Sequence, residues 1–126
     1  MKKVGFWYSE EDRRQPIPRS NYGDNWPGKA EWCAALAMLE LRMHNSQKEA
    51  VPLGSIVPEK RSHNCKVCGV SLDDRHFVLD GFTWPEHYSH YLQEHNIAPD
   101  PAFKQFIIDW AAAHIVISGE PFLIQQ

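Results

Sequence analysis

The sequence has too few cysteines for a disulfide framework and no apolar run that would cross a bilayer. It contains three Cys in 126 residues, and an odd count does not suit a set of structural disulfides. No segment is both long and apolar enough for a membrane span, and the opening stretch MKKVGFWYSEEDRR lacks the apolar core of a signal peptide. We therefore expect a cytoplasmic protein that has no membrane partner.

The chain also lacks an excess of positive charge. Its formal net charge is −3, whereas a protein that binds a nucleic-acid backbone needs a concentrated cationic face. One basic cluster exists, Lys60 and Arg61 with Lys66 nearby, but aspartates at positions 73, 74 and 80 follow it closely. A mixed, solvated surface explains this cluster better than a DNA-binding patch does. We do not expect nucleic acid to be the main partner.

The sequence does contain enough apolar and aromatic residues to form one hydrophobic core. Hydrophobic residues make up 43% of the chain and aromatic residues 12%, which excludes a disordered polypeptide. The length allows one domain and is too short for two ordinary ones. We therefore treat 1–126 as a single domain.

The first half predicts an irregular segment followed by a helix. Residues 1–27 contain a short apolar stretch at 4–9, expected as a strand, and then a Pro-rich run that disfavours regular structure. Residues 28–45 place apolar side chains at helical spacing, namely Trp32, Leu36, Leu39 and Met43. Cys33 falls within this helix and is expected to be a small buried residue. Residues 46–64 predict a long connection with a short strand at 55–57.

The second half predicts strands and two further helices. A strand near 75–80 should end at the turn pair Asp80-Gly81. A helix is expected at 85–95, because Thr83 and Glu86 have the spacing of a capping box. A last helix at 100–114 begins with Asp100 as cap and carries an apolar stripe, Phe103, Phe106, Ile107 and Trp110. The tail 115–126 is expected as a strand or an irregular tail, and as a strand it could pair with residues 4–9. The expected fold class is a small α+β domain with a zinc knuckle, short strands and about three helices.

The stretch CKVCG, residues 65–69, carries the clearest chemical signal. Two Cys separated by two residues can chelate one metal ion from a tight knuckle, and a glycine after the second Cys relieves crowding there. A thioredoxin-like pair would instead open a helix after a strand. Zinc binds four ligands in structural sites, and a mixture of thiolates and imidazoles is usual. The Cys65 and Cys68 pair therefore predicts a zinc site that two histidines complete.

The histidines that can complete the site lie mostly downstream: His76, His87, His90 and His95, with His63 just upstream. His87 and His90 are three residues apart and share one helix face, whereas His87 and His95 are two turns apart and cannot both reach one ion. His90 and His95 are five apart, about 140° around a regular helix, so they converge only if the last turn loosens. Asn96 and the following IAPDP are a helix stop that allows such loosening.

From Cys65 to about Phe103 the sequence resembles a group of small bacterial proteins of unassigned function. Their shared elements correspond here to Cys65, Cys68, Gly69, Asp80, Gly81, Trp84, Pro85, Glu86, His90, Tyr91, Glu94, His95, Pro99 and Phe103. The opening VGFWYS is also similar to the start of that group, whereas residues 28–60 resemble it only weakly. The group has a small residue at the position of His87, so the resemblance implies the ligand set Cys65, Cys68, His90 and His95 in a zinc module spanning 65–96.

Four protein ligands leave zinc no open position, so we expect a structural site and no catalytic residue. The leading hypothesis is a non-enzymatic protein-binding module, for example a bacterial or phage accessory, immunity or inhibitor protein. Its expected contact region is the aromatic and Pro-rich segment 6–27. One alternative is a metal-dependent hydrolase or nuclease that uses His76 or His87 with an acidic neighbour: Asp73, Asp74, Glu86 or Glu94. A second alternative is nucleic-acid binding through the zinc module with Lys60, Arg61 and Lys66.

Overall fold

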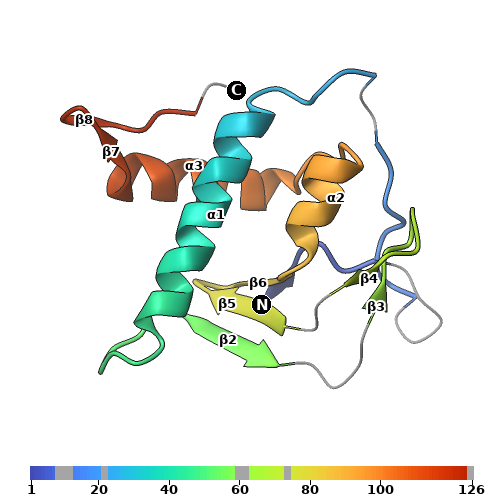
Figure 1. Cartoon of the computed structure of the whole chain (residues 1–126), viewed down its shortest axis with the longest axis horizontal. Coiled ribbons are helices and arrows are strands. Elements are labelled where there is room, and N and C mark those ends of the chain that lie inside the picture. The colour runs from blue at the N-terminus through green and yellow to red at the C-terminus, as the bar shows by residue number, and fades with distance from the viewer. Residues whose placement is uncertain (8–12, 21–22, 59–62, 73–74, 125–126) are drawn as a thin grey trace.

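Three helices and several short strands make up the part of the chain that the computed structural model describes, namely residues 1–7, 13–20, 23–58, 63–72 and 75–124. The helices are α1 (Lys29–Ser46), α2 (Tyr88–Glu94) and α3 (Pro101–His114). In Figure 1 they lie above a small sheet, and α1 crosses in front of α3. The fold class is α+β, as the sequence predicts. No helix among the described residues has the length and apolar character needed to cross a bilayer.

The sheet has four strands in the order β1 (Lys2–Lys3), β6 (Phe82–Pro85), β5 (Arg75–Leu79) and β2 (Ser55–Pro58). Strands β5 and β6 form an antiparallel hairpin, β2 pairs antiparallel with β5, and β1 runs parallel to β6. The predicted turn pair is confirmed, because Asp80 and Gly81 both have positive φ values, 48° and 86°. A two-residue hairpin loop with two positive φ angles matches the right-handed twist of its strands.

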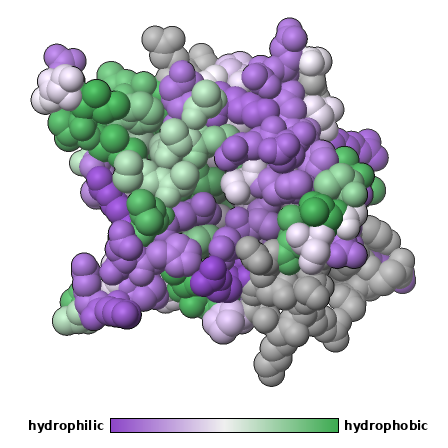
Figure 2. All heavy atoms as spheres, in the orientation of Figure 1, coloured by the Kyte–Doolittle hydropathy of each residue, from purple (hydrophilic) through white to green (hydrophobic). Residues whose placement is uncertain are grey.

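Two separate hairpins lie outside this sheet. Strands β3 (His63–Asn64) and β4 (Ser71–Leu72) form a ribbon beside α2. Strands β7 (Val116–Ile117) and β8 (Glu120–Pro121) pair with each other beyond α3. The prediction that the tail pairs with residues 4–9 was therefore wrong: the two-residue turn at Ser118-Gly119 closes the tail on itself. Figure 2 shows apolar surface gathered over this last hairpin and the adjoining helices.

The N-terminal strand is shorter and earlier than the sequence predicts. Residues 4–7 are not in a strand, and residues 8–9 lie outside the described part of the chain. The backbone of Lys2 and Val4 instead donates to carbonyls of Gly81 and Thr83, at 2.7 and 3.0 Å. Pairing stops there because Gly5 has φ +75°, and a Cβ at that position would lie 2.5 Å from the Tyr88 ring. Only glycine lets the chain pass so close to this ring.

The predicted start of the middle helix was also wrong. Thr83 and Pro85 belong to β6, and α2 begins only at Tyr88, so no capping box forms. Glu86 instead makes an ion pair with Arg75. Proline is tolerated at the end of β6 because the pairing with β1 reaches only as far as Thr83, so no partner strand needs its missing N–H. In contrast, Asp100 caps α3 as predicted, since its carboxylate accepts the N–H groups of Ala102 and Phe103.

One aromatic core joins the helices to the sheet. Trp32 of α1, Trp84 of β6 and Phe103 of α3 are fully buried. The Trp84 and Phe103 ring centroids are 4.9 Å apart, and the indole N–H of Trp32 donates to the carbonyl of Lys104 at 3.1 Å. Cys33 is buried, as expected, and burial raises the pKa of its thiol to about 11. This core fixes the position of α2, and α2 with the residue directly after it carries half of the predicted metal ligands, His90 and His95.

Candidate metal centre

The β3–β4 ribbon presents the two cysteines on a tight turn. The N–H of Cys65 donates to the carbonyl of Val70 at 2.8 Å, and the N–H of Gly69 donates back to the carbonyl of Cys65 at 2.9 Å. Gly69 has φ +76°, a conformation that other residues adopt only with strain. The turn therefore explains why glycine follows the second cysteine, and it holds both sulfur atoms on the side of the ribbon that faces α2.

The chain leaves regular helical geometry at the end of α2, between His90 and His95. The helix ends at Glu94, and His95 follows with φ −111° and ψ 7°. Asn96 is left-handed, with φ 51°, and the N–H of Ile97 donates to the carbonyl of Tyr91, six residues back. A regular helix connects residues four apart, so the chain widens after Glu94. This widening is the loosening that lets His95 turn toward His90.

Asn96 also anchors this helix end to the first part of the chain. Its side-chain N–H donates to the carbonyl of Asp24 at 2.6 Å, and its side-chain oxygen accepts from Lys29 at 3.3 Å. The hydroxyl of Ser20 donates to the Asn96 carbonyl at 3.1 Å. Because left-handed asparagine is a common helix stop, the same residue ends α2 and locks the position of His95.

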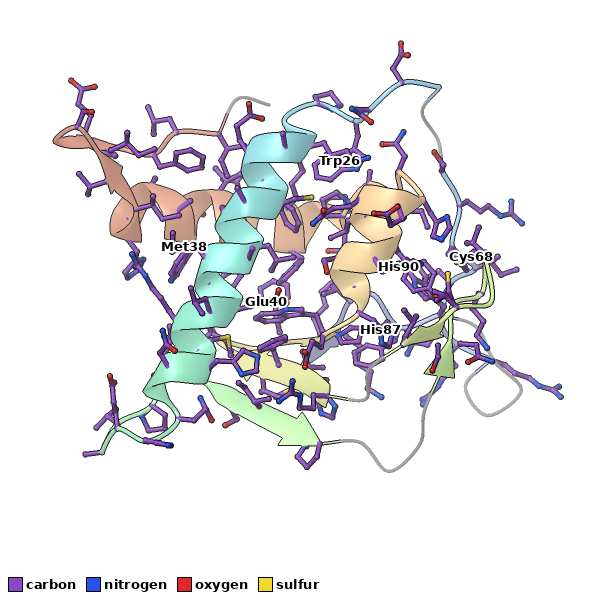
Figure 3. All side chains as sticks on the ribbon, viewed as in Figure 1. Trp26, Met38, Glu40, Cys68, His87 and His90 are labelled. Carbon is purple, nitrogen blue, oxygen red and sulfur yellow. The ribbon has the colours of Figure 1, made fainter. Side chains whose placement is uncertain are left out.

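The four predicted ligands come together. The ligand atoms of Cys65, Cys68, His90 and His95 all lie within 4.8 Å of one another, a group that could hold a metal ion. The Sγ of Cys65 is 3.3 Å from Nε2 of His95, the Sγ of Cys68 is 3.5 Å from Nε2 of His90, and the two Nε2 atoms are 3.1 Å apart. Figure 3 shows Cys68 and His90 next to each other, reaching from the ribbon and from α2.

These separations match the edges of a tetrahedron around one ion. Zinc bonds of about 2.3 Å to sulfur and about 2.05 Å to nitrogen give S···N edges of about 3.6 Å and N···N edges of about 3.3 Å. The two S···N distances and the N···N distance given above differ from these edges by about 0.3 Å or less. Three of the six donor–donor edges thus fit a tetrahedral ion, and all four donor atoms lie within 4.8 Å of one another.

The surroundings of Cys65 favour the thiolate that binds metals. Burial alone would raise the pKa of this thiol, but hydrogen bonds from the backbone of Cys68 and Val67, and from the side chains of Cys68 and His90, lower it to about 6. The N–H of Val67 lies 3.4 Å from the sulfur. Backbone N–H donors to a cysteine sulfur stabilise its negative charge. The knuckle thus supplies one ligand that is ionised at neutral pH.

Tyr91 supports the site, and sequence reasoning gave it no role. Its side chain is buried with Cys65 and Ile97 in a small second core. The phenol oxygen accepts the N–H of Lys66 at 2.9 Å, which ties α2 to the backbone between the two cysteines. Burial raises the pKa of Tyr91 to about 12, so the hydroxyl stays neutral. The sequence signals for this role were its position beside His90 and its place among the elements shared with the group of small bacterial proteins.

The other predicted candidates lie apart from this group. His87 stands just before α2, with its ring 6.1 Å from that of Tyr91. His76 lies in β5, with its ring 6.2 Å from that of Phe6. Both carboxylate oxygens of Glu86 contact the guanidinium of Arg75, at 2.8 and 3.0 Å, and Glu94 is exposed. Lys60, Arg61, Asp73 and Asp74 lie outside the described residues.

A polar hollow next to the site contains a residue that the sequence did not single out. Glu40 of α1, with Glu86, His87 and Ser89, lines a cavity of about 430 Å³. Burial raises the pKa of Glu40 to about 8, against a smaller lowering by the indole N–H of Trp84, which donates to it at 2.9 Å. Glu40 is therefore mostly protonated at neutral pH. Its position on a helix of mixed pattern gave no sign of this burial.

Comparison with known proteins gives no family for the chain. No family model matches the sequence, and the searches of curated proteins and of solved structures found no match. The resemblance to the group of small bacterial proteins therefore stays a prediction.

Proposed function

We propose that this protein is a non-enzymatic protein-binding module whose ribbon is stapled to α2 by one structural zinc ion. The observation that supports the proposal is the convergence of two sulfur and two imidazole donors at tetrahedral distances. Two thiolates and two imidazoles are a typical structural zinc set, whereas magnesium and calcium prefer oxygen ligands. Four protein ligands leave no position for water or substrate, so the metal stabilises the fold and the function resides in a surface.

The surface that we assign to partner binding includes the described parts of segment 6–27. Half-buried Phe6 and Trp7 and exposed Ile17 lie close together along one cleft. Aromatic residues beside exposed apolar ones are typical of interface centres. An accessory, immunity or inhibitor role in a bacterium or phage fits a small module of this kind.

Metal analysis of matched histidine variants tests the proposal. We expect one zinc per wild-type chain, nearly unchanged zinc in His87→Ala, and at least a tenfold loss of zinc affinity in His95→Ala. Cobalt substitution should give the intense visible absorption of a tetrahedral site with two thiolates. If His87→Ala loses the metal while His95→Ala keeps it, the ligand set is wrong. A cobalt spectrum that indicates a water molecule bound to the metal would contradict the structural role, because a structural site has no open position.

The hydrolase alternative is favoured by one observation, the hollow that holds Glu40, Glu86 and His87. A carboxyl whose pKa is raised, beside a second carboxyl, is a pattern seen in acid–base catalysis. Metal-loaded protein should be assayed against ester, phosphodiester and glycoside model substrates, with Glu40→Gln as the matched variant. Turnover that Glu40→Gln abolishes would replace the binding proposal with an enzymatic one.

A further inference from the structure

A cleft lies between the N-terminal segment and the start of α3. It has a volume of about 670 Å³, within the range of ligand-binding clefts. One wall is formed by Lys3–Trp7 and by Pro16, Ile17 and Arg19, and the other by Ile97–Pro101 and Lys104. The close approach of Gly5 to Tyr88 fixes the first wall, so the cleft is a built feature of the fold.

The charge in this cleft is opposite to that of the whole chain. The chain has a net charge of −3, yet Lys3, Arg19 and Lys104 line the cleft, with Asp100 as its acidic residue. Asp100 is already engaged, because it caps α3 and lies 3.4 Å from Lys2. Lys3, Arg19 and Lys104 form no ion pair with any carboxylate of the described residues. Three cations that have no acidic partner among the described residues thus line one hollow.

Aromatic rings hold two of these cations in place. The ammonium of Lys3 lies 5.8 Å from the centre of the Phe6 ring, and that of Lys104 lies 5.8 Å from the Trp26 ring. Cation–π contacts of this kind position a charge without neutralising it. The remaining lining is apolar and includes Trp7, Ile97 and Pro99. The cleft therefore offers positively charged side chains around an apolar floor.

On the basis of the proposed function, we propose that this cleft binds an acidic peptide segment of the partner protein, with an apolar or aromatic side chain between its carboxylates. Carboxylates pair with Lys and Arg through charge-assisted hydrogen bonds, and an apolar anchor in a pocket supplies most of the affinity in many interfaces. A nucleic-acid strand fits less well, because three cations neutralise few phosphates and the chain as a whole is negative.

Short capped peptides test the inference by calorimetry with zinc-loaded protein. The probes are Ac-Glu-Asp-Xaa-Asp-Glu-NH2, with Phe, Trp, Leu or Met at Xaa, and the matched amides Ac-Gln-Asn-Xaa-Asn-Gln-NH2. We expect at least one acidic peptide to bind about tenfold more tightly than its amide counterpart. Lys104→Glu and Arg19→Glu should each weaken that peptide at least about fivefold. Lys48→Glu, which makes the same charge change at an exposed site outside the cleft lining, should change affinity less than about twofold.

Three results would overturn the inference. The first is that no acidic peptide exceeds its amide counterpart. The second is that Lys48→Glu weakens binding as much as Lys104→Glu, which would indicate only general attraction. The third is that a twelve-nucleotide oligothymidine binds and the peptides do not. Zinc content and circular dichroism are measured on the same samples. If both are normal while the peptides fail, the cleft assignment is wrong and the zinc-stapled module still stands.

Discussion

The main core and the β3–β4 ribbon differ in what holds them together. The main core unites three helices with the four-stranded sheet and buries the rings of Trp32, Trp84 and Phe103. The ribbon has two strands of two residues each, and its core consists of Cys65, Tyr91 and Ile97. An isolated two-stranded hairpin is marginally stable at best. The first region can therefore fold through apolar burial, whereas the second has little such burial and, in our proposal, depends on a metal ion.

This difference makes the dependence between the regions one-sided. Helix α2 contributes Tyr88 and Leu92 to the main core and Tyr91 to the second one. The histidines are therefore placed by the main core before any metal binds, while the cysteines have no comparable support. We expect damage to the core to remove the metal site, and damage to the site to leave the core folded.

The largest loss of stability should follow from removing an aromatic ring from the main core. Phe103→Ala removes a fully buried ring at the junction of α3, Trp32 and Trp84, and such changes cost about 3–5 kcal/mol. Urea denaturation followed by tryptophan fluorescence measures this free energy of unfolding. The protein should release zinc at the same urea concentration at which the main core unfolds. A loss below about 1 kcal/mol, or zinc retained by the unfolded core, would contradict the one-sided dependence.

A pH-dependent effect of intermediate size should come from Glu40. Its pKa is raised from 4.5 to about 8 in the folded chain, so the stability it contributes is full below pH 4.5 and is lost as pH rises through about 8. Glu40→Gln keeps an acceptor for Trp84 and cannot ionise. The variant should gain stability over wild type between pH 6 and pH 9, by on the order of 1–3 kcal/mol. Parallel stability curves over this range, with zinc present, would show that Glu40 does not retain its proton.

The smallest effect on global stability should come from removing the metal. Chelation should speed hydrogen exchange at the amides of Cys65, Lys66 and Gly69 by more than about tenfold, because their hydrogen bonds lie within the ribbon or between it and Tyr91. Amides of the β5–β6 hairpin serve as the internal control and should keep their protection. If both groups lose protection together, the two regions form one cooperative unit.

Most of the candidate site could be predicted from the sequence because its signals are local. The Cys pair with its glycine, and a helix stop directly after His95, are short patterns with direct geometric meaning. The choice between His87 and His95 as the partner of His90 needed more than spacing, since both pairs were sterically open. The structure brings His90 and His95 to the cysteines, and their role as ligands stays a prediction until metal is measured.

The errors in the fold arose where pairing connects distant residues. Nothing near Lys2 and Lys3 indicates that they run parallel to Phe82 and Thr83, because this contact spans about 80 positions. The stretch TWPE fits both a helix start and a strand end, and the hairpin with β5 decides between them. The tail carried its own turn, Ser118-Gly119, but an apolar pattern does not identify the partner strand.

The two cysteines of the candidate site differ in exposure, and this difference determines which of them a reagent in solution reaches first. Cys65 is only 3% exposed, whereas Cys68 is open to solvent. We therefore expect peroxide or an alkylating reagent to react at Cys68 first, leaving an ion held by three remaining donors. In our proposal, loss of zinc under oxidation would then begin at Cys68, the more exposed of the two cysteines.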